Sequence, residues 1–140
     1  MDHVDLAIIG SGSGNSLVTP DFADAQVAVI EQGVFGGTCL NVGCIPTKMY
    51  VHTADLAVAA RDSARFGVDS RVDAVRWRDI RDRIFGRIDP ISRGGRDYRL
   101  TGPGTTAYLG HARFTGDRTL DIALNDGGRA QVRAEQVVIA

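Results

Sequence analysis

Two short apolar runs stand near the beginning of the chain, over residues 4–9 and 27–31. Uninterrupted apolar runs of this length are typical of strands that are buried on both faces of a parallel sheet. The first run ends at Gly10, which opens a glycine-rich turn, and a weak helix is predicted over residues 15–25 although Pro20 interrupts it. Strand, turn, helix and strand therefore follow one another at the spacing of a β-α-β unit.

Two helices are predicted in the middle of the chain. A long one, rich in Ala and Leu, covers residues 39–65, and Gly43 and Pro46 are expected to distort its first turns. The second covers residues 74–88, where apolar residues recur at steps of three and four, as on the buried face of an amphipathic helix. The residues of this apolar stripe are Trp77, Ile80, Ile84 and Ile88, and we expect Trp77 to anchor the helix in the core.

The last third of the chain predicts strands. A Gly-Pro-Gly break at residues 102–104 precedes three segments, residues 106–114, 119–124 and 130–133, which predict a small antiparallel meander. Residues 136–140 predict a further buried strand. Because the chain stops on this strand, we expect it to be a fragment of a longer protein. The whole pattern predicts an α/β fold.

Composition and charge narrow the classes of protein that fit this pattern. The 140 residues suffice for one domain, and 44% apolar and 24% charged residues are ordinary globular values, which excludes disorder and coiled coil. Seventeen acids against 16 bases leave a net charge of −1, which gives no reason to expect nucleic acid or an anionic membrane as a partner. No stretch reaches the roughly 20 apolar residues of a membrane span, and no signal peptide is visible, so we expect a cytoplasmic location.

One segment, from Arg76 to Arg99, is strongly basic, with eight Arg and four Asp. A nucleic-acid-binding helix is conceivable here. The interleaved acids and the apolar stripe fit a solvated amphipathic helix better, so no nucleic-acid partner is expected.

The turn after the first predicted strand is the first candidate site. Gly10 and Gly12 follow a strand and open a helix, and Glu31 ends the next strand 21 positions after Gly10. Glycines at these places let backbone N–H groups approach a pyrophosphate, while the acid accepts hydrogen bonds from an adenosine ribose. Asn15 stands where the third glycine of this fingerprint is expected, and the motif alone leaves FAD and NAD open. The predicted dinucleotide-binding residues are Gly10, Gly12, Ser13, Gly14 and Glu31.

The two cysteines, Cys39 and Cys44, form the second candidate site. In a regular helix, residues five apart would have Cα atoms about 8–9 Å apart, whereas a disulfide needs less than about 7 Å. A bridge therefore requires a bent turn, which Gly43 and Pro46 would permit. Such a bridge would be a poor structural staple and a good redox couple, and a helix N-terminus would favour the thiolates. Metal binding and two inert thiols are the alternatives, but the three histidines lack the spacing of a metal site.

A short connector joins the two candidate sites. Cys39 follows Glu31 by eight residues, so an extended connector covers about 26 Å, enough to run beside a stretched dinucleotide from its ribose to its reactive end. The dithiol would then lie against a nicotinamide or flavin ring. A flavin is favoured because it can pass electrons to a disulfide while it stays bound.

The string Gly-Gly-Thr-Cys-Leu-Asn-Val-Gly-Cys-Ile-Pro-Thr-Lys at residues 36–48 resembles the active-site signature of the FAD-dependent pyridine nucleotide–disulfide oxidoreductases. Residues 12–16 and 85–91 resemble one subgroup of this family, in which Asn also stands at the third-glycine position. The resemblance implies a partial Rossmann-like FAD-binding domain with a βαβ unit, long helices and a small antiparallel β-meander. Residues 1–140 would be the N-terminal part of that domain, without the NADPH-binding and dimerisation domains of the family.

This resemblance implies an enzyme in which NADPH reduces FAD, FAD reduces the Cys39–Cys44 disulfide, and the dithiol reduces a small-molecule disulfide. It also implies that Cys39 exchanges with the substrate, that Cys44 and Lys48 lie by the flavin, and that the full-length protein is a homodimer. The catalytic histidine of the family would come from sequence outside this chain, so the chain alone is expected to be inactive. The residues that the resemblance adds to the expected FAD site are Gly37, Thr38, Cys39 and Lys48.

Two other interpretations stay open at this point. A relative of lipoamide dehydrogenase or glutathione reductase would run the same dithiol–flavin chemistry on another substrate. A non-catalytic dinucleotide-binding module, whose cysteines only sense oxidation, is the alternative from a different class. Bound flavin together with NADPH-driven disulfide reduction would separate the enzymes from the module.

Overall fold

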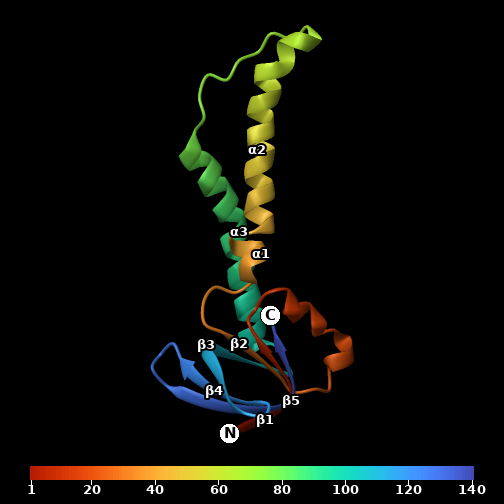
Figure 1. Ribbon diagram of the computed structural model, residues 1–140, viewed down its shortest axis with the longest axis vertical. Coiled ribbons are helices and arrows are strands. Elements are labelled where there is room, and N and C mark those ends of the chain that lie inside the picture. Colours follow the sequence, from red (N-terminus) through yellow and green to blue (C-terminus); the bar gives the residue numbers. More distant parts are fainter.

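The computed structural model describes residues 1–140 as a closed sheet from which a pair of long helices projects (Figure 1). The strands are β1 (Asp2–Ile9), β2 (Val27–Glu31), β3 (Thr105–Gly116), β4 (Thr119–Leu124) and β5 (Arg129–Ile139). The helices are α1 (Gly37–Asn41), α2 (Cys44–Asp62) and α3 (Trp77–Thr101). The predicted α/β class is confirmed.

The sheet closes because two long strands, β3 and β5, each pair with two neighbours along different parts of their length. β1 pairs in parallel with both β2 and β5, and β2 pairs in parallel with the first half of β3. The second half of β3 pairs with β4, and β4 pairs with the first half of β5, both antiparallel. The sheet is therefore a parallel layer and an antiparallel meander that share β3 and β5. The segments predicted at residues 130–133 and 136–140 belong to one strand, β5, because the same continuous backbone serves both layers.

All three predicted helices differ in the structure, and the segment expected as one helix over residues 39–65 is divided into α1 and α2. The helix expected over residues 15–25 is absent: the connection between β1 and β2 holds only short 3₁₀ segments, Ser13–Leu17 and Pro20–Phe22. Pro20 disfavours a continuous α-helix here, because it lacks a backbone N–H and its ring clashes with the preceding turn. The helix expected over residues 74–88 begins at Trp77 and runs to Thr101, passing through Pro90.

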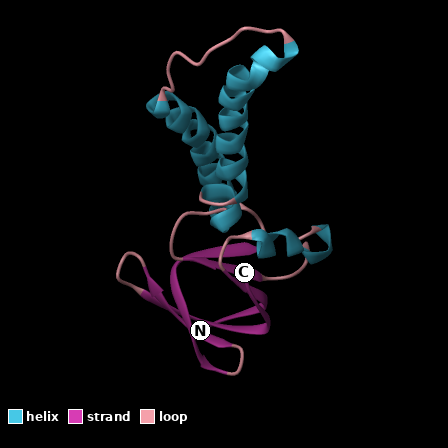
Figure 2. Ribbon diagram, turned by 45° about the horizontal axis from the view of Figure 1, so that its top comes forward, coloured by secondary structure: helices cyan, strands magenta, loops and turns pink.

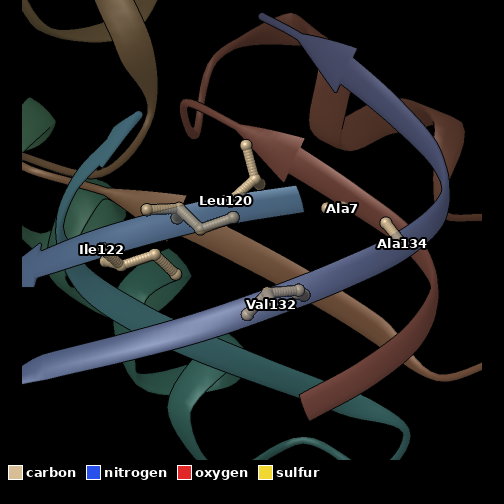
Figure 3. Packing of buried hydrophobic residues seen from close by; sticks show 7 residues of the cluster. Ala7, Leu120, Ile122, Val132 and Ala134 are labelled. Carbon is tan, nitrogen blue, oxygen red and sulfur yellow. The ribbon is translucent and has the colours of Figure 1, made fainter. Parts of the chain in front are cut away.

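The core lies in two layers. Inside the closed sheet, Ala7, Leu120, Ile122, Val132 and Ala134 meet, together with Ala28 and Ile30 (Figure 3). On the outer face of the parallel layer, the alternate residues of β1 and β2 pack around the ring of Phe35. The members of this outer cluster are Leu6, Ile8, Val27, Val29 and Phe35. Successive residues of β2 and of β1 from Leu6 to Ile8 thus point to opposite faces that are both buried, as the apolar runs predict.

The long helices are less buried than the sheet. α2 and α3 lie together near the sheet and diverge toward the loop that joins them (Figure 2). Ile84, Ile88 and Ser92 form the buried face of α3, whereas Trp77 is 58% exposed and stacks on Tyr50, so the expectation that Trp77 anchors the core is wrong. None of the helices combines the length and the apolar character that a membrane-spanning helix requires.

Candidate functional site

The glycine turn after β1 approaches the end of β5. Gly10 has a left-handed backbone (φ 101°), and a Cβ built there would collide with the Ala140 carbonyl. A Cβ at Gly14 would collide with the Ala140 side chain. Both positions therefore require glycine. Gly14, one place before the expected third glycine, is the residue that allows the turn to pack closely on β5.

Asn15 stands at that third-glycine position, within the 3₁₀ segment Ser13–Leu17. Its side-chain Nδ2 donates to the Gly10 carbonyl at 3.2 Å, which closes the turn on itself. Its Oδ1 is buried and has no hydrogen-bond partner. The Asn15 side-chain amide thus adds a hydrogen bond within the turn, which a glycine at this position could not make.

Glu31 sits at the end of β2 and already binds the glycine turn. Its Oε2 accepts hydrogen bonds from the Ser11 backbone N–H at 2.9 Å and from the Ser11 hydroxyl at 2.6 Å, and its Oε1 accepts one from the Gly33 N–H at 2.7 Å. The Ser11 hydroxyl in turn accepts the Gly36 N–H at 3.1 Å. Each carboxylate oxygen has two acceptor sites, so these three bonds leave one site, on Oε1, for a ribose hydroxyl. Sequence reasoning missed Ser11, which is 5% exposed.

The loop before the cysteines is built from glycines in contact with the nucleotide turn. Gly36 and Gly37 both have positive φ, 105° and 65°. A Cβ at Gly37 would lie 2.5 Å from the Gly12 Cα, so the two glycine backbones touch. This contact brings the two candidate sites of the sequence together.

The cysteines lie on either side of a helix break. Cys39 is in α1 and Cys44 is the first residue of α2. A Cβ at Gly43 would stand 2.8 Å from the Thr38 carbonyl oxygen, so glycine permits the tight turn between the helices. Pro46, in the first turn of α2, is compatible with a helix start. The expected distortion at Gly43 is confirmed, and it divides the helix predicted over residues 39–65 into α1 and α2.

Both thiols are exposed and free. The hydrogen bond with the Cys44 side chain raises the pKa of Cys39, and desolvation and the Cys44 charge raise it further, while a hydrogen bond from the Cys44 backbone N–H and the Lys48 charge lower it. The net shift of the Cys39 pKa in the dithiol form is upward, while the backbone N–H of Cys44 at the start of α2 acts in the direction expected of a helix N-terminus.

Phe35 fixes the start of the loop that leads to Cys39, through both its ring and its backbone carbonyl. Its ring is 4% exposed in the outer core cluster. Its carbonyl accepts hydrogen bonds from Asn41 Nδ2 at 2.9 Å and from the Ser92 hydroxyl at 2.6 Å. Asn41 Nδ2 also donates to the Gly37 carbonyl at 3.0 Å. Neither Asn41 nor Ser92 was a candidate from the sequence.

The glycine turn, Glu31 and both cysteines line one open cavity of about 770 Å³. Its volume falls in the range of roughly 300–1,000 Å³ usual for small-molecule and cofactor sites. The predicted site residues that line it are Gly10, Gly12, Ser13, Glu31, Gly37, Thr38, Cys39 and Cys44. Gly14 and Lys48 lie outside the lining, and Gly110–Ala112 of β3, which sequence reasoning missed, are part of it.

These residues fit a flavin dinucleotide. Gly12 presents bare backbone to the cavity, Glu31 offers a ribose acceptor, and the two cysteines line the same space. No group of three or more His, Cys, Asp or Glu side chains is arranged to hold a metal ion. The donor set therefore suits a dinucleotide beside a dithiol.

Comparison with known proteins agrees with this chemistry. No protein-family model matches the chain. Its fold matches the solved Cu(II) complex of the HOCl-induced flavoprotein disulfide reductase RclA from Escherichia coli with a TM-score of 0.77 and 28% identity, over 100% of this chain and 29% of that one. A mercuric reductase of Shigella flexneri is 32% identical over 139 residues, 96% of this chain and 25% of the relative.

The fold and site thus resemble those of the FAD-dependent pyridine nucleotide–disulfide oxidoreductases. Within that class, the chain resembles mycothione reductase, the subgroup that residues 12–16 and 85–91 indicated. It is 50% identical to the mycothione reductase of Mycobacterium tuberculosis (strain ATCC 25618 / H37Rv) over 143 residues, 100% of this chain. The chain spans 31% of the length of that relative.

Proposed function

We propose that this chain binds FAD and carries the redox-active dithiol of a mycothione reductase. In the complete protein, NADPH would drive the reduction of mycothione to two molecules of mycothiol. The observation that supports this most directly is the shared cavity, which is lined by the glycine turn, by Glu31 and by both cysteines. The 50% identity to a mycothione reductase, against 32% to a mercuric reductase, favours mycothione as the substrate.

The dithiol chemistry follows from the two sulfurs. The Cys39 thiolate attacks one sulfur of the substrate disulfide, which forms a mixed disulfide and releases one mycothiol. Cys44 then attacks the Cys39 sulfur, releases the second mycothiol and leaves the Cys39–Cys44 disulfide. FAD, when bound, supplies the two electrons that return this disulfide to the dithiol, and NADPH is their source.

The chain's own residues would orient these partners. Glu31 would accept a hydrogen bond from a ribose hydroxyl, and the N–H groups of the turn at Gly12 and Ser13 would donate to the pyrophosphate. Gly37 and Thr38 would lie along the cofactor between its two ends. Lys48 would place positive charge near the flavin and the dithiol, in keeping with its lowering effect on the Cys39 pKa.

The two cysteines would have different positions relative to the cofactor. We assign Cys39 to the substrate side and Cys44 to the flavin side. In the FAD-loaded, reduced protein, alkylation should therefore label Cys39 first, because the flavin covers Cys44. Labelling of Cys44 first would reverse the two roles.

The complete protein is proposed to be a homodimer. The helical pair exposes an unusual number of apolar side chains, and exposed apolar surface of this kind marks interaction sites. The exposed apolar residues at the end of the pair that holds the connecting loop include Val51, Leu56, Val58, Phe66, Val68, Val72, Val75 and Trp77. A second subunit would cover part of this surface.

The deciding experiment compares substrates with the complete, purified protein. Flavin content is measured by absorbance, and NADPH oxidation is followed with mycothione, glutathione disulfide and lipoamide in turn. We expect bound FAD and fastest turnover of mycothione, with Cys39→Ser and Cys44→Ser each abolishing turnover while FAD is retained. A protein that binds no flavin, or one that prefers another disulfide, contradicts the proposal.

A further inference from the structure

The buried face of α3 contains a serine where its pattern calls for an apolar residue. Ile84 and Ile88 are buried at a spacing of four residues, and the next position, Ser92, is buried as well, at 8% exposure. A hydroxyl removed from water is unfavourable unless it is hydrogen-bonded. The Ser92 hydroxyl donates a 2.6 Å hydrogen bond to the carbonyl of Phe35, which lies 57 residues away in the sequence.

That carbonyl belongs to the residue at which the cysteine loop leaves the core. Gly36 and Gly37 follow it, both with positive φ and without side chains that could hold them in place. The position of the loop therefore depends on its hydrogen bonds. Ser11 and Asn41 supply bonds from the nucleotide turn and from α1, and Ser92 supplies the bond that comes from α3.

We propose that Ser92 is a positioning residue for the dithiol: its bond to Phe35 holds the loop so that Cys39 stays within reach of Cys44. A disulfide requires the two Cβ atoms to approach to about 3.5–4.5 Å, whereas two thiols tolerate looser positions. A loop that is held in place therefore favours the disulfide over the dithiol. This inference rests on the proposed function only in taking Cys39 and Cys44 as the redox couple.

The test measures the equilibrium of that couple in the complete protein. The two cysteine thiols react with glutathione disulfide to give the Cys39–Cys44 disulfide and two glutathione thiols, so two electrons and two protons pass to glutathione. Protein equilibrated at a series of glutathione ratios is quenched in acid and alkylated, and the disulfide fraction is read by mass. We expect Ser92→Ala to shift the equilibrium constant about two- to tenfold toward the dithiol, the range that corresponds to one lost hydrogen bond. A tenfold shift equals about 30 mV.

Three further variants separate positioning from loss of stability. Ser92→Thr keeps the hydroxyl and should restore the wild-type equilibrium. Thr101→Ala removes a hydroxyl of the same helix that bonds only the Asp97 carbonyl, and it should leave the equilibrium unchanged. Ile122→Val, in the core inside the closed sheet, lowers stability without touching the loop and should also leave it unchanged.

Asn41→Ala gives a second test of the same contact, because Asn41 donates to the same carbonyl as Ser92. Its effect and that of Ser92→Ala should be non-additive in the double variant, as expected for groups that share a partner. An unchanged equilibrium in Ser92→Ala, or an equal shift in Ile122→Val, overturns the inference. If Ser92→Ala shifts the equilibrium of the Cys39–Cys44 couple but the protein binds no FAD, the inference stands and the proposed function fails. If the protein shows flavin-dependent turnover but Ser92→Ala does not shift the equilibrium, the proposed function stands and the inference fails.

Discussion

The hydroxyl of Ser11 donates a 2.6 Å hydrogen bond to the Glu31 carboxylate and at the same time accepts the N–H of Gly36. One buried side chain thus connects the acid proposed to bind the adenosine ribose with the loop that leads to Cys39. Occupation of the nucleotide site and the position of the dithiol loop are therefore physically linked. A change at Glu31 is expected to affect both.

Replacement of Glu31 by Ala should weaken FAD binding in the complete protein by about 1.5–3 kcal/mol, the range for a lost hydrogen bond to a charged group. Fluorescence titration of the apoprotein with FAD measures this change. Glu135→Ala, which removes an exposed acid on β5, serves as the matched control and should leave the affinity unchanged. An unaltered FAD affinity in the Glu31 variant removes this residue from the site.

Local sequence patterns predict most of the strands. β2 and β4 have the predicted bounds, because each is a short run whose ends are marked by polar or turn residues. Closure of the sheet was not predictable in the same way. It depends on β3 and β5 serving two layers, and the polar residues near Glu135 make the two halves of β5 look like separate strands.

The candidate site was predictable where the chemistry needs a residue type at a fixed spacing. The glycines, Glu31 and the cysteine pair carry such spacing, and most of them line the cavity. Ser11 and Ser92 carry none, since a serine in a turn or on a helix is common. Their importance comes from partners 20 to 57 residues away, which only the folded chain brings together.

The contact between Gly37 and Gly12 gives a direct test of the loop geometry. Gly37→Ala combines a positive φ with a Cβ that would stand 2.5 Å from the Gly12 Cα, so the loop must move away from the nucleotide turn. We expect lower stability and weaker FAD binding. Gly94→Ala is the matched control: it lies inside α3 with open space around its Cβ position, and it should raise stability by about 0.5–1 kcal/mol. Urea unfolding of both variants and FAD titration distinguish the two outcomes, and equal behaviour would contradict the close approach.

The reactivity of Cys39 should depend on pH in a way that its neighbours explain. Because the bond with Cys44 raises its pKa, Cys39 in the reduced, cofactor-free chain should react with iodoacetamide at a higher pH than an unperturbed thiol. Lys48→Met removes the charge that lowers this pKa and should move the profile further upward. Cys44→Ala removes the hydrogen bond and should move it downward. Rate against pH, read by mass for the Cys39 peptide, provides the measurement, and a Lys48 variant that shifts the profile downward contradicts the assigned contacts.

Tyr108 should make the stability of the chain sensitive to alkaline pH. Its hydroxyl donates a 2.5 Å hydrogen bond to the Asp2 carboxylate, and burial, this bond and the Asp2 charge raise the Tyr108 pKa well above its ordinary value of 10.0. The folded chain therefore keeps the phenol proton to a higher pH than the unfolded chain does. Stability from this contact is fully present below about pH 10 and is lost as the pH rises above that value, because the unfolded state then binds fewer protons. Tyr108→Phe should accordingly lower the free energy of unfolding near neutral pH by less than ~1 kcal/mol, since the pair is partly exposed, and its difference from wild type should shrink above pH 10. Urea unfolding at a series of pH values, with reductant present to protect the thiols, measures this difference. A difference that stays constant or grows between pH 8 and pH 11 would show that the Tyr108–Asp2 bond does not set the titration of the phenol.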